Sequence, residues 1–188
     1  AALAPELNAR DKAVVIIGGG DTGSDCVGTA IRQGAKKVTM VEILPKPPQS
    51  RSSNDPWPTY PNIFRKSSSL EEGGEILWST LTTEFTGDIG HVSGVKIQKV
   101  EWDAGKFEKV GQQSEISADL VVQAIGFELD RSNSLYIQNG LKITENGLLV
   151  AEDKKIFTAG DCSTGPSLIV NTINEGRKIS EKIIKELL

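Results

Sequence analysis

A glycine-rich stretch over residues 14–42, VVIIGGGDTGSDCVGTAIRQGAKKVTMVE, limits the possible folds more than any other part of the sequence. The β-branched run from Lys12 to Ile17 predicts a strand that is buried on both faces of a parallel sheet. The pattern then predicts a helix over residues 22–33, closed by Gly34 as its C′ residue, and a second buried strand over residues 38–42. These elements form a βαβ unit, whose crossover is expected to be right-handed.

The turn inside this unit matches the spacing G-x-G-x-x-G at Gly18, Gly20 and Gly23. The first glycine allows a sharp turn, the second lets a pyrophosphate approach the backbone, and the third lets the helix pack close to the sheet. The start of the helix adds free N–H groups and partial positive charge. Because a strand precedes the turn and a helix follows it, we expect dinucleotide binding rather than a glycine turn without a ligand. The predicted contacts are Gly18, Gly19, Gly20, Asp21, Thr22 and Gly23.

The charged residues after the second strand leave the choice of coenzyme open. Glu42 ends that strand, where an acid would bind the ribose hydroxyls of NADH. Lys46 and Arg51 follow on the next loop and could hold the 2′-phosphate of NADPH. Each of these three side chains could also be an ordinary solvated residue.

The remaining sequence predicts further layers around the parallel sheet. Residues 45–69 are rich in proline and serine and indicate a long irregular excursion, followed by a short helix over residues 71–77. Alternating patterns over residues 81–110 indicate a small antiparallel meander, and residues 120–125 another buried strand. Residues 141–150 suggest short strands. We therefore expect a three-layer α/β domain, Rossmann-like, with a parallel central sheet and a small antiparallel β-meander.

A second motif begins at Ile156, with the sequence IFTAGDCSTGPSLIVNTINEGRKISEKI. It predicts a short strand over residues 156–159, the residues Ala-Gly-Asp, and an amphipathic helix from Ser167 to the end. Within that helix, Glu175 and Arg177 are interpreted as a solvated pair. Without a ligand, Ala-Gly-Asp would be a simple exit from a strand.

These stretches resemble a known family. The second motif looks like the closing flavin motif of flavoproteins with two dinucleotide-binding domains. The segments GGGDTGSDCVGTAIRQGAKKVTMVEILPKPP, NDPWPTYPNIFR, SSSLEEGGEILWSTLTTEFTGDIGHVSGVKIQKVEW and ADLVVQAIGF resemble the small (beta) subunit of glutamate synthase. That family lies within the FAD/NAD(P)-dependent pyridine nucleotide oxidoreductases. The resemblance covers nearly the whole chain from Lys12 onward, mainly the C-terminal portion of the subunit.

The resemblance implies an oxidoreductase that passes hydride from NADPH or NADH to FAD. Electrons would continue through iron–sulfur clusters to a large subunit, which makes glutamate from glutamine and 2-oxoglutarate. Gly160 and Gly126 would allow close backbone approach, Asp161 would bind the flavin ribityl chain, and the helix start near Ser167 would face the flavin. No catalytic side chain is expected, because the cofactors carry hydride transfer.

The same resemblance implies a domain organisation. Residues 1–11 are expected to be a linker or cut end, residues 12–150 an NAD(P)-binding domain, and residues 151–188 the C-terminal segment of a discontinuous FAD-binding domain. The first flavin glycine turn is absent, so the chain is expected to be inactive by itself. Cys26 and Cys162 cannot ligate a cluster that needs four thiolates, so the clusters are expected elsewhere and no metal site is predicted here.

Composition excludes several other classes of function. The net charge is −4 and the 21 Lys and Arg residues are scattered, which argues against nucleic-acid binding. The longest apolar run, residues 13–17, is too short for a bilayer of roughly 30 Å. The start of the sequence does not resemble a secretory signal, and we expect a cytoplasmic protein.

Two enzyme classes fail on their motifs. Short-chain dehydrogenases need Tyr-x-x-x-Lys, but Tyr60 and Tyr136 are followed four positions later by Phe64 and Gly140. Without a C-x-x-C pair, dithiol chemistry like that of thioredoxin reductase is excluded. His91 lies in a predicted turn and is not expected to be catalytic.

Two alternatives stay open. The first is the NAD(P)H-binding half of another iron–sulfur flavoprotein reductase. The second is a non-catalytic module that binds nucleotide and docks a subunit, with Trp57, Tyr60 and Phe64 forming either a partner surface or a cover over the nucleotide.

Overall fold

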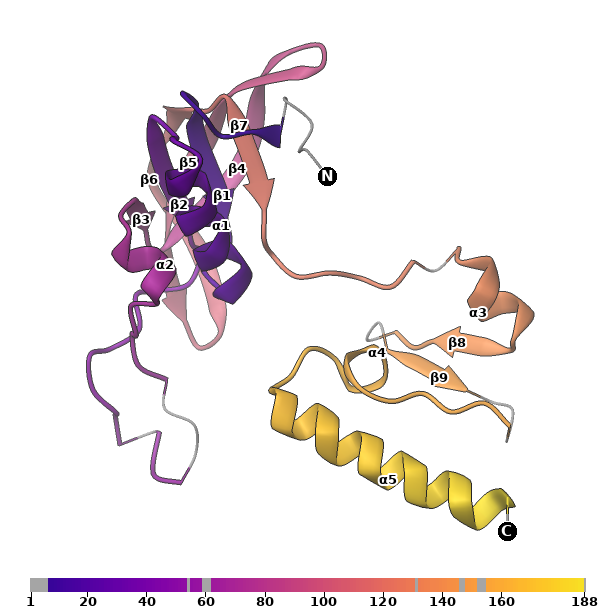
Figure 1. Cartoon of the computed structure of the whole chain (residues 1–188). Coiled ribbons are helices and arrows are strands. Elements are labelled where there is room, and N and C mark those ends of the chain that lie inside the picture. Colours follow the sequence, from indigo (N-terminus) through magenta and orange to yellow (C-terminus); the bar gives the residue numbers. More distant parts are fainter. Residues whose placement is uncertain are drawn as a thin grey trace. The chain divides into compact units, whose positions relative to one another are not determined.

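The computed structural model describes residues 7–53, 55–58, 62–130, 132–145, 148–151 and 155–187. Tyr60, one of the aromatic residues considered for a partner surface, lies outside these ranges. The chain divides into two compact units, Ala1–Ile125 and Gly126–Leu188, here called the N-terminal and C-terminal units (Figure 1). This division concerns compactness alone, so the boundary placed after residue 150 on the basis of cofactor binding stays a prediction.

A four-stranded parallel sheet forms the centre of the N-terminal unit. It contains β1 (Ala13–Ile17), β2 (Lys37–Val41), β3 (Glu75–Leu77) and β7 (Leu120–Gln123), in the order β3-β2-β1-β7. The helix α1 (Asp21–Arg32) joins β1 to β2, which pair in parallel. This is the predicted βαβ unit. Gly34 follows the helix with φ 88° and donates its backbone N–H to the carbonyl of Ile31 at 2.9 Å, as expected of a C′ glycine.

The predicted meander is a three-stranded antiparallel sheet. It consists of β4 (Thr80–Asp88), β5 (His91–Asp103) and β6 (Lys106–Ser117), with β5 in the middle. The strands are longer than the sequence pattern indicated. Their outer residues are largely exposed, so only the inward half of each strand carries an apolar signal.

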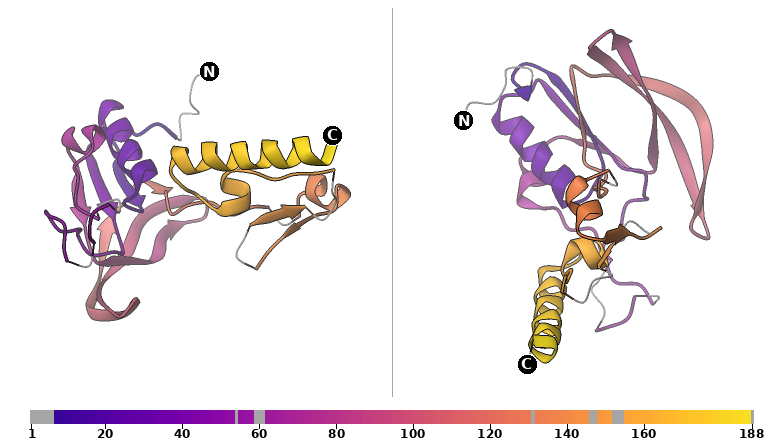
Figure 2. Two further views of the ribbon diagram at one scale, coloured as in Figure 1. Left: turned by 90° about the horizontal axis from the view of Figure 1, so that it is seen from below. Right: turned by 90° about the vertical axis from the view of Figure 1, so that its right-hand side faces the viewer.

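The parallel sheet is the middle of three layers, with helices α1 and α2 (Ser68–Glu71) on one face and the antiparallel sheet on the other (Figure 2). Val14 and Ile16 pack with residues of α1 and with Leu70 of the short helix α2. Between them in sequence, Val15 points the other way and packs with Val95 and Ile97 of β5. Because successive side chains of a strand alternate between faces, a continuous apolar run is required here. The predicted three-layer α/β fold with a Rossmann-like parallel sheet is confirmed.

The helix predicted over residues 71–77 is wrong. The helix α2 ends at Glu71, and Gly73 and Gly74 follow with φ 134° and 87°. These backbone conformations are open mainly to glycine and stop the helix. Residues 75–77 then form β3, which pairs in parallel with β2 and extends the sheet by one strand.

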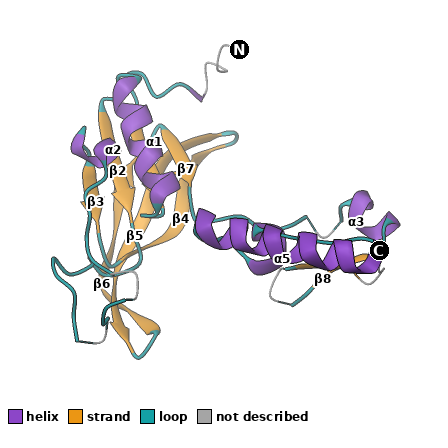
Figure 3. Ribbon diagram, turned by 60° about the horizontal axis from the view of Figure 1, so that its bottom comes forward, coloured by secondary structure: helices purple, strands orange, loops and turns teal. Residues whose placement is uncertain are grey.

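The described part of the C-terminal unit contains a β-hairpin and helices, of which α5 (Ile169–Leu187) is the longest (Figure 3). The hairpin strands β8 (Leu141–Ile143) and β9 (Leu149–Ala151) confirm the short strands expected over residues 141–150. The helices are α3 (Ser134–Gln138), α4 (Asp161–Thr164) and α5 (Ile169–Leu187).

Two details of the second motif differ from the prediction. Residues 156–159 do not form a strand, and the Thr158 hydroxyl instead donates to the carbonyl of Leu149 in β9 at 3.1 Å. The last helix begins at Ile169, two residues after Ser167. Among the described helices, none combines the length and apolar character needed to cross a bilayer.

Candidate functional site

Two glycines of the turn are required by the fold itself. Gly18 has φ +108°, and a Cβ there would lie 2.3 Å from the carbonyl oxygen of Ala124. A Cβ on Gly23 would lie 2.0 Å from the carbonyl oxygen of Gly18. Both positions are therefore closed to any side chain, because real Cβ atoms do not come so close to backbone. Because Gly18 and Gly23 have no side chains, α1 can pack directly against the turn.

Gly20 is different, because nothing lies within 4 Å of a Cβ placed on it. Its φ of −74° is one that any residue adopts, so neither packing nor backbone conformation requires glycine here. Gly20 is the N-cap of α1, and no side chain caps this end of the helix. The amides of the first turn therefore face the open space in front of Gly20, where an anion would be stabilised.

The carboxylate of Glu42 is turned toward the glycine turn. Glu42 follows β2 and is 9% exposed. Its Oε2 accepts a hydrogen bond from the backbone amide of Gly19, and its Oε1 accepts one from the amide of Leu44 at 2.8 Å. A Cβ on Gly19 would lie 2.6 Å from this Oε2. A side chain on Gly19 would therefore displace the Glu42 carboxylate from the turn.

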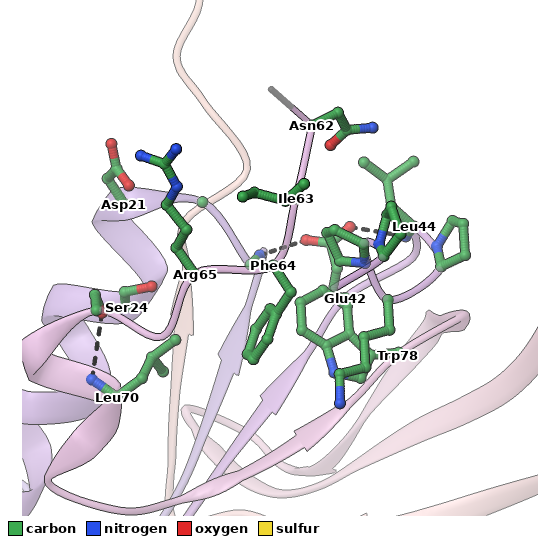
Figure 4. Close-up of a pocket in the computed structure, with 17 residues that line it drawn as sticks. Asp21, Ser24, Glu42, Leu44, Asn62, Ile63, Phe64, Arg65, Leu70 and Trp78 are labelled. Atoms are coloured by element: carbon green, nitrogen blue, oxygen red, sulfur yellow. Dashed lines mark hydrogen bonds between the residues drawn. The ribbon is translucent and has the colours of Figure 1, made fainter. Parts of the chain in front are cut away.

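A pocket of about 550 Å³ opens beside the turn (Figure 4). One wall is formed by the glycine turn and the start of α1, through Gly19, Gly20, Asp21 and Ser24. The other walls come from Glu42, directly after β2, and from the proline-rich loop, here defined as residues 44–67. Both the first and the last residues of this loop line the pocket. The irregular excursion of the sequence therefore folds back to enclose the space in front of Gly20.

The two arms of the proline-rich loop are joined at Phe64. Its backbone amide donates to the carbonyl of Pro48 at 2.8 Å. Its ring packs edge-on against Trp78 with 5.7 Å between centroids, and the Lys46 ammonium lies 5.1 Å from the centre of the same ring. Phe64 thus forms part of the pocket wall, whereas Trp57 is 81% exposed.

The cations of the loop are arranged differently from the prediction. Lys46 lines the pocket as expected. Arg51 is absent from its lining, and its guanidinium lies 3.7 Å from the Asp55 carboxylate and 3.1 Å from the Asp55 carbonyl oxygen. Arg65, which the sequence analysis missed, extends along the pocket near Asp21 and Ser24 (Figure 4). Its position just before Ser67, the N-cap of α2, is the only sequence signal that could have indicated it.

A second pocket of about 470 Å³ also borders the turn and shares Gly19, Gly20, Glu42 and Leu44 with the first. Its lining is mostly apolar and includes Ile17, Val41, Ile43, Leu81, Ala124 and Ile125. Thr82 also lines it. Its hydroxyl is buried and is the one such side-chain polar atom without a hydrogen-bond partner among the described residues.

The side chain of Thr22 faces neither pocket. It lines a separate hollow of about 450 Å³ between α1 and the edge strand β7. Its contribution to an anion site would therefore come from its backbone amide.

The C-terminal unit brings the Ala-Gly-Asp residues against α5. Gly160 has φ +78° and donates its amide to Glu175 at 2.8 Å. The carboxylate of Asp161 accepts a hydrogen bond of 3.3 Å from Thr172. Glu175 also accepts from Ser163 at 3.0 Å, so its interpretation as one half of a solvated pair with Arg177 is wrong. Residues two apart on a helix do not face each other.

Gly126 and Ser167 take less defined places. Gly126 has φ +97°, and a Cβ at this position would meet nothing within 4 Å, so its glycine is explained by conformation. Ser167 is exposed and lies just before α5. In the described part of the chain, no three His, Cys, Asp or Glu side chains lie together as a metal site would require.

The comparison with protein families decides where this site belongs. The family described as pyridine nucleotide-disulphide oxidoreductase matches residues 1–176. The chain belongs to this family. Its two cysteines, Cys26 and Cys162, are both free and do not form a C-x-x-C pair.

Curated members with similar sequences are glutamate synthases, which confirms the resemblance. The chain is 44% identical over 191 residues to the glutamate synthase [NADPH] small chain of Mycobacterium tuberculosis, covering 98% of this chain and 39% of that one. It is 35% identical to the glutamate synthase [NADH] of Saccharomyces cerevisiae, covering 95% of this chain and 9% of that one. The chain thus spans about two fifths of the length of the bacterial small chain.

Two solved structures share the fold of this chain. FprA of Mycobacterium tuberculosis in complex with NADPH matches with a TM-score of 0.69 at 13% identity, covering 97% of this chain and 54% of that one. Thioredoxin reductase of T. acidophilum matches with a TM-score of 0.62 at 21% identity, covering 94% and 53%. At these identities the likeness supports the family's fold alone.

Proposed function

We propose that the N-terminal unit binds a nicotinamide dinucleotide with its pyrophosphate in front of Gly20. The observation that carries this proposal is the open space at Gly20, at an uncapped helix N-terminus between two pockets. Packing does not require glycine at this position, whereas close approach of a phosphate does. A pyrophosphate fits this site, because the space it would occupy is the space that a Cβ on Gly20 would otherwise fill. The contacts proposed are those predicted at Gly18, Gly19, Gly20, Asp21, Thr22 and Gly23.

The two pockets suit the two halves of the coenzyme. The first borders the end of β2, where the adenosine ribose lies in this type of fold, and it carries charged and aromatic side chains. The second is apolar and suits the nicotinamide ring, and the unpartnered hydroxyl of Thr82 gives it a polar group for the carboxamide. Both volumes lie within the usual range of roughly 300–1,000 Å³ for ligand pockets.

We further propose that the chain is part of an NAD(P)H-dependent flavoprotein oxidoreductase of the glutamate synthase type. Residues 12–150 would form the NAD(P)-binding domain, and residues 151–188 would complete an FAD-binding domain. Gly126, Gly160, Asp161 and Ser167 would lie along the flavin, and the left-handed conformation of Gly160 supports close backbone approach there. A bound flavin would accept hydride from the nicotinamide, while these residues bind and orient the cofactors without a catalytic side chain.

The relatives' names support the rest of this proposal. Several of the curated relatives are small chains of glutamate synthase, which supports a large-subunit partner, glutamate as the final product, and iron–sulfur clusters outside this chain. A cytoplasmic location belongs to the same proposal. A docking role for the proline-rich loop is the second candidate, and the 81% exposure of Trp57 favours it, although Phe64 lines the nucleotide pocket.

Calorimetric titration of the chain with NADPH and NADH tests the proposal. We expect heat with at least one coenzyme, and none with either would contradict it. Gly20→Val places a branched side chain in the pyrophosphate space and should abolish binding. Gly176→Val is the matched control, because Gly176 on α5 has equally open surroundings. Unchanged affinity of Gly20→Val would refute the assignment of the turn.

A further inference from the structure

The arrangement of charges around the first pocket bears on which coenzyme is taken. This inference rests on the proposed dinucleotide site. We infer that the coenzyme is NADPH and that Lys46 and Arg65, from the two arms of the proline-rich loop, hold its 2′-phosphate. The cation that the sequence favoured beside Lys46, Arg51, has no part in this site.

A backbone hydrogen bond closes the proline-rich loop. The hydrogen bond from the Phe64 amide to the Pro48 carbonyl joins the outgoing and returning arms. Lys46 lies before this bond on one arm and Arg65 directly after it on the other, and both line the same pocket. Two cations that are distant in sequence are thereby brought to one ligand space. Arg51, by contrast, is held by Asp55 within the loop.

The proline-rich loop would meet the adenosine end of the coenzyme. In a βαβ unit of this type, the adenosine ribose lies at the carboxyl end of the second strand. Here that end is Glu42, and the proline-rich loop begins two residues later. The 2′ position of the ribose therefore faces the loop, while the pyrophosphate faces Gly20.

The negative charge of Glu42 would oppose a 2′-phosphate. Both of its carboxylate oxygens accept backbone amides, from Gly19 and Leu44, and the residue is 9% exposed. Its carboxylate is thus oriented by the turn and stabilised by two N–H dipoles. Glu42 serves as a positioning residue for the glycine turn, and Lys46 and Arg65 are the cations that line the pocket, where the carboxylate of Asp21 is also present.

The chemistry of the two cations is complementary. A guanidinium offers a planar pair of donors that matches two phosphate oxygens, whereas an ammonium acts as a compact point charge. Phe64 holds the Lys46 ammonium over its ring and so directs it across the pocket wall. NADH lacks the group that these cations would bind.

The test compares Arg65→Gln with Lys66→Gln in the full chain. Both variants remove one positive charge, so they change the net charge equally. Lys66 is the adjacent cation and is absent from the pocket lining, which makes it the control. We expect Arg65→Gln to weaken NADPH by roughly 10- to 100-fold, the usual range for loss of a charged hydrogen bond, and to leave NADH unchanged. Lys46→Gln should act in the same direction but less strongly, and Arg65→Lys should restore part of the affinity. Lys66→Gln should leave both coenzymes unchanged.

Other results would overturn the inference in distinguishable ways. Equal weakening of NADPH and NADH by Arg65→Gln would assign this residue to the pyrophosphate that both share. Equal wild-type affinities that Arg65→Gln does not alter would remove the 2′-phosphate site but leave dinucleotide binding intact. Failure of both coenzymes to bind the wild type would defeat the proposed function itself. Adenosine 2′-phosphate, titrated into the wild type with adenosine as reference, provides a measurement independent of variant folding: equal affinity for the two would overturn the inference.

Discussion

The carboxylate of Glu42 accepts a hydrogen bond from the backbone amide of Gly19, and so ties the end of β2 to the turn that follows β1. Glu42→Ala would leave this amide and that of Leu44 without their partner. We expect a loss of about 1–3 kcal/mol in the free energy of unfolding, the usual range for a buried group left unpaired. Urea denaturation measures it. Because the whole turn depends on this contact, affinity for NADPH and NADH should fall together, and a loss confined to NADH would instead identify Glu42 as a direct ribose ligand.

The glycines of the turn should separate by their effects on stability. Gly23→Ala forces a methyl group against the carbonyl oxygen of Gly18 and should destabilise the N-terminal unit by about 3 kcal/mol or more, at the upper end for overpacking. Gly20→Ala meets no neighbour and should lose only about 1 kcal/mol, because alanine is a poorer N-cap than glycine. Denaturation curves of the two variants provide the comparison. Equal losses would contradict the open surroundings of Gly20.

The contact between Glu175 and Gly160 predicts a local change in the C-terminal unit. Glu175→Ala removes the acceptor of the Gly160 amide and of the Ser163 hydroxyl. Hydrogen exchange at the Gly160 amide should therefore become faster, since an amide without its acceptor is less protected. Arg177→Ala on the same helix is the control and should leave that amide unchanged. The same exchange rate in both variants would mean that Glu175 does not hold the turn.

The surroundings of Cys26 predict a pH dependence. Burial, together with the negative charge of Asp25, raises the pKa of the Cys26 thiol. The folded state therefore keeps its proton at a pH where the unfolded chain, with a thiol pKa of about 8.5, has lost it. The free energy of unfolding is therefore highest below the unfolded pKa and decreases as pH rises from there through the folded pKa.

Thiolate absorbance of a Cys162→Ser variant measures this titration. The midpoint should lie above the ordinary thiol value. Asp25→Asn should lower the midpoint only in part, because burial is the larger cause. A midpoint at or below that of an exposed thiol would contradict this description of the site.

Local patterns accounted for much of the fold. The β-branched run of β1 predicted a strand covered on both faces, and Val14 and Val15 indeed pack into different layers. The ends of helices and strands were predicted less well where local signals compete. Residues 71–77 carry a helical start, but Gly73 and Gly74 end it, and pairing with β2 turns residues 75–77 into a strand. Pairing between distant strands is invisible to a local pattern.

The candidate site divides in the same way. The positions of Gly18, Gly20 and Gly23 follow from their spacing, because all three lie in the one turn that joins β1 to α1. Sequence proximity suggested Arg51 as the partner of Lys46, but the loop turns Arg51 toward Asp55 and returns Arg65 to the pocket. Likewise, the hydrogen bond between the Gly160 amide and Glu175 depends on how α5 packs beside the turn that begins α4.

The sequence by itself determined the βαβ unit, its glycine turn and the family to which the chain belongs. These depend on residues that are neighbours along the chain, or on patterns with a fixed period. Only the tertiary structure decided which cations face the pocket, which glycine is free of packing contacts and what the acid after β2 binds. Those outcomes depend on how a long irregular loop closes and on how side chains far apart in sequence meet, and local propensity contains neither.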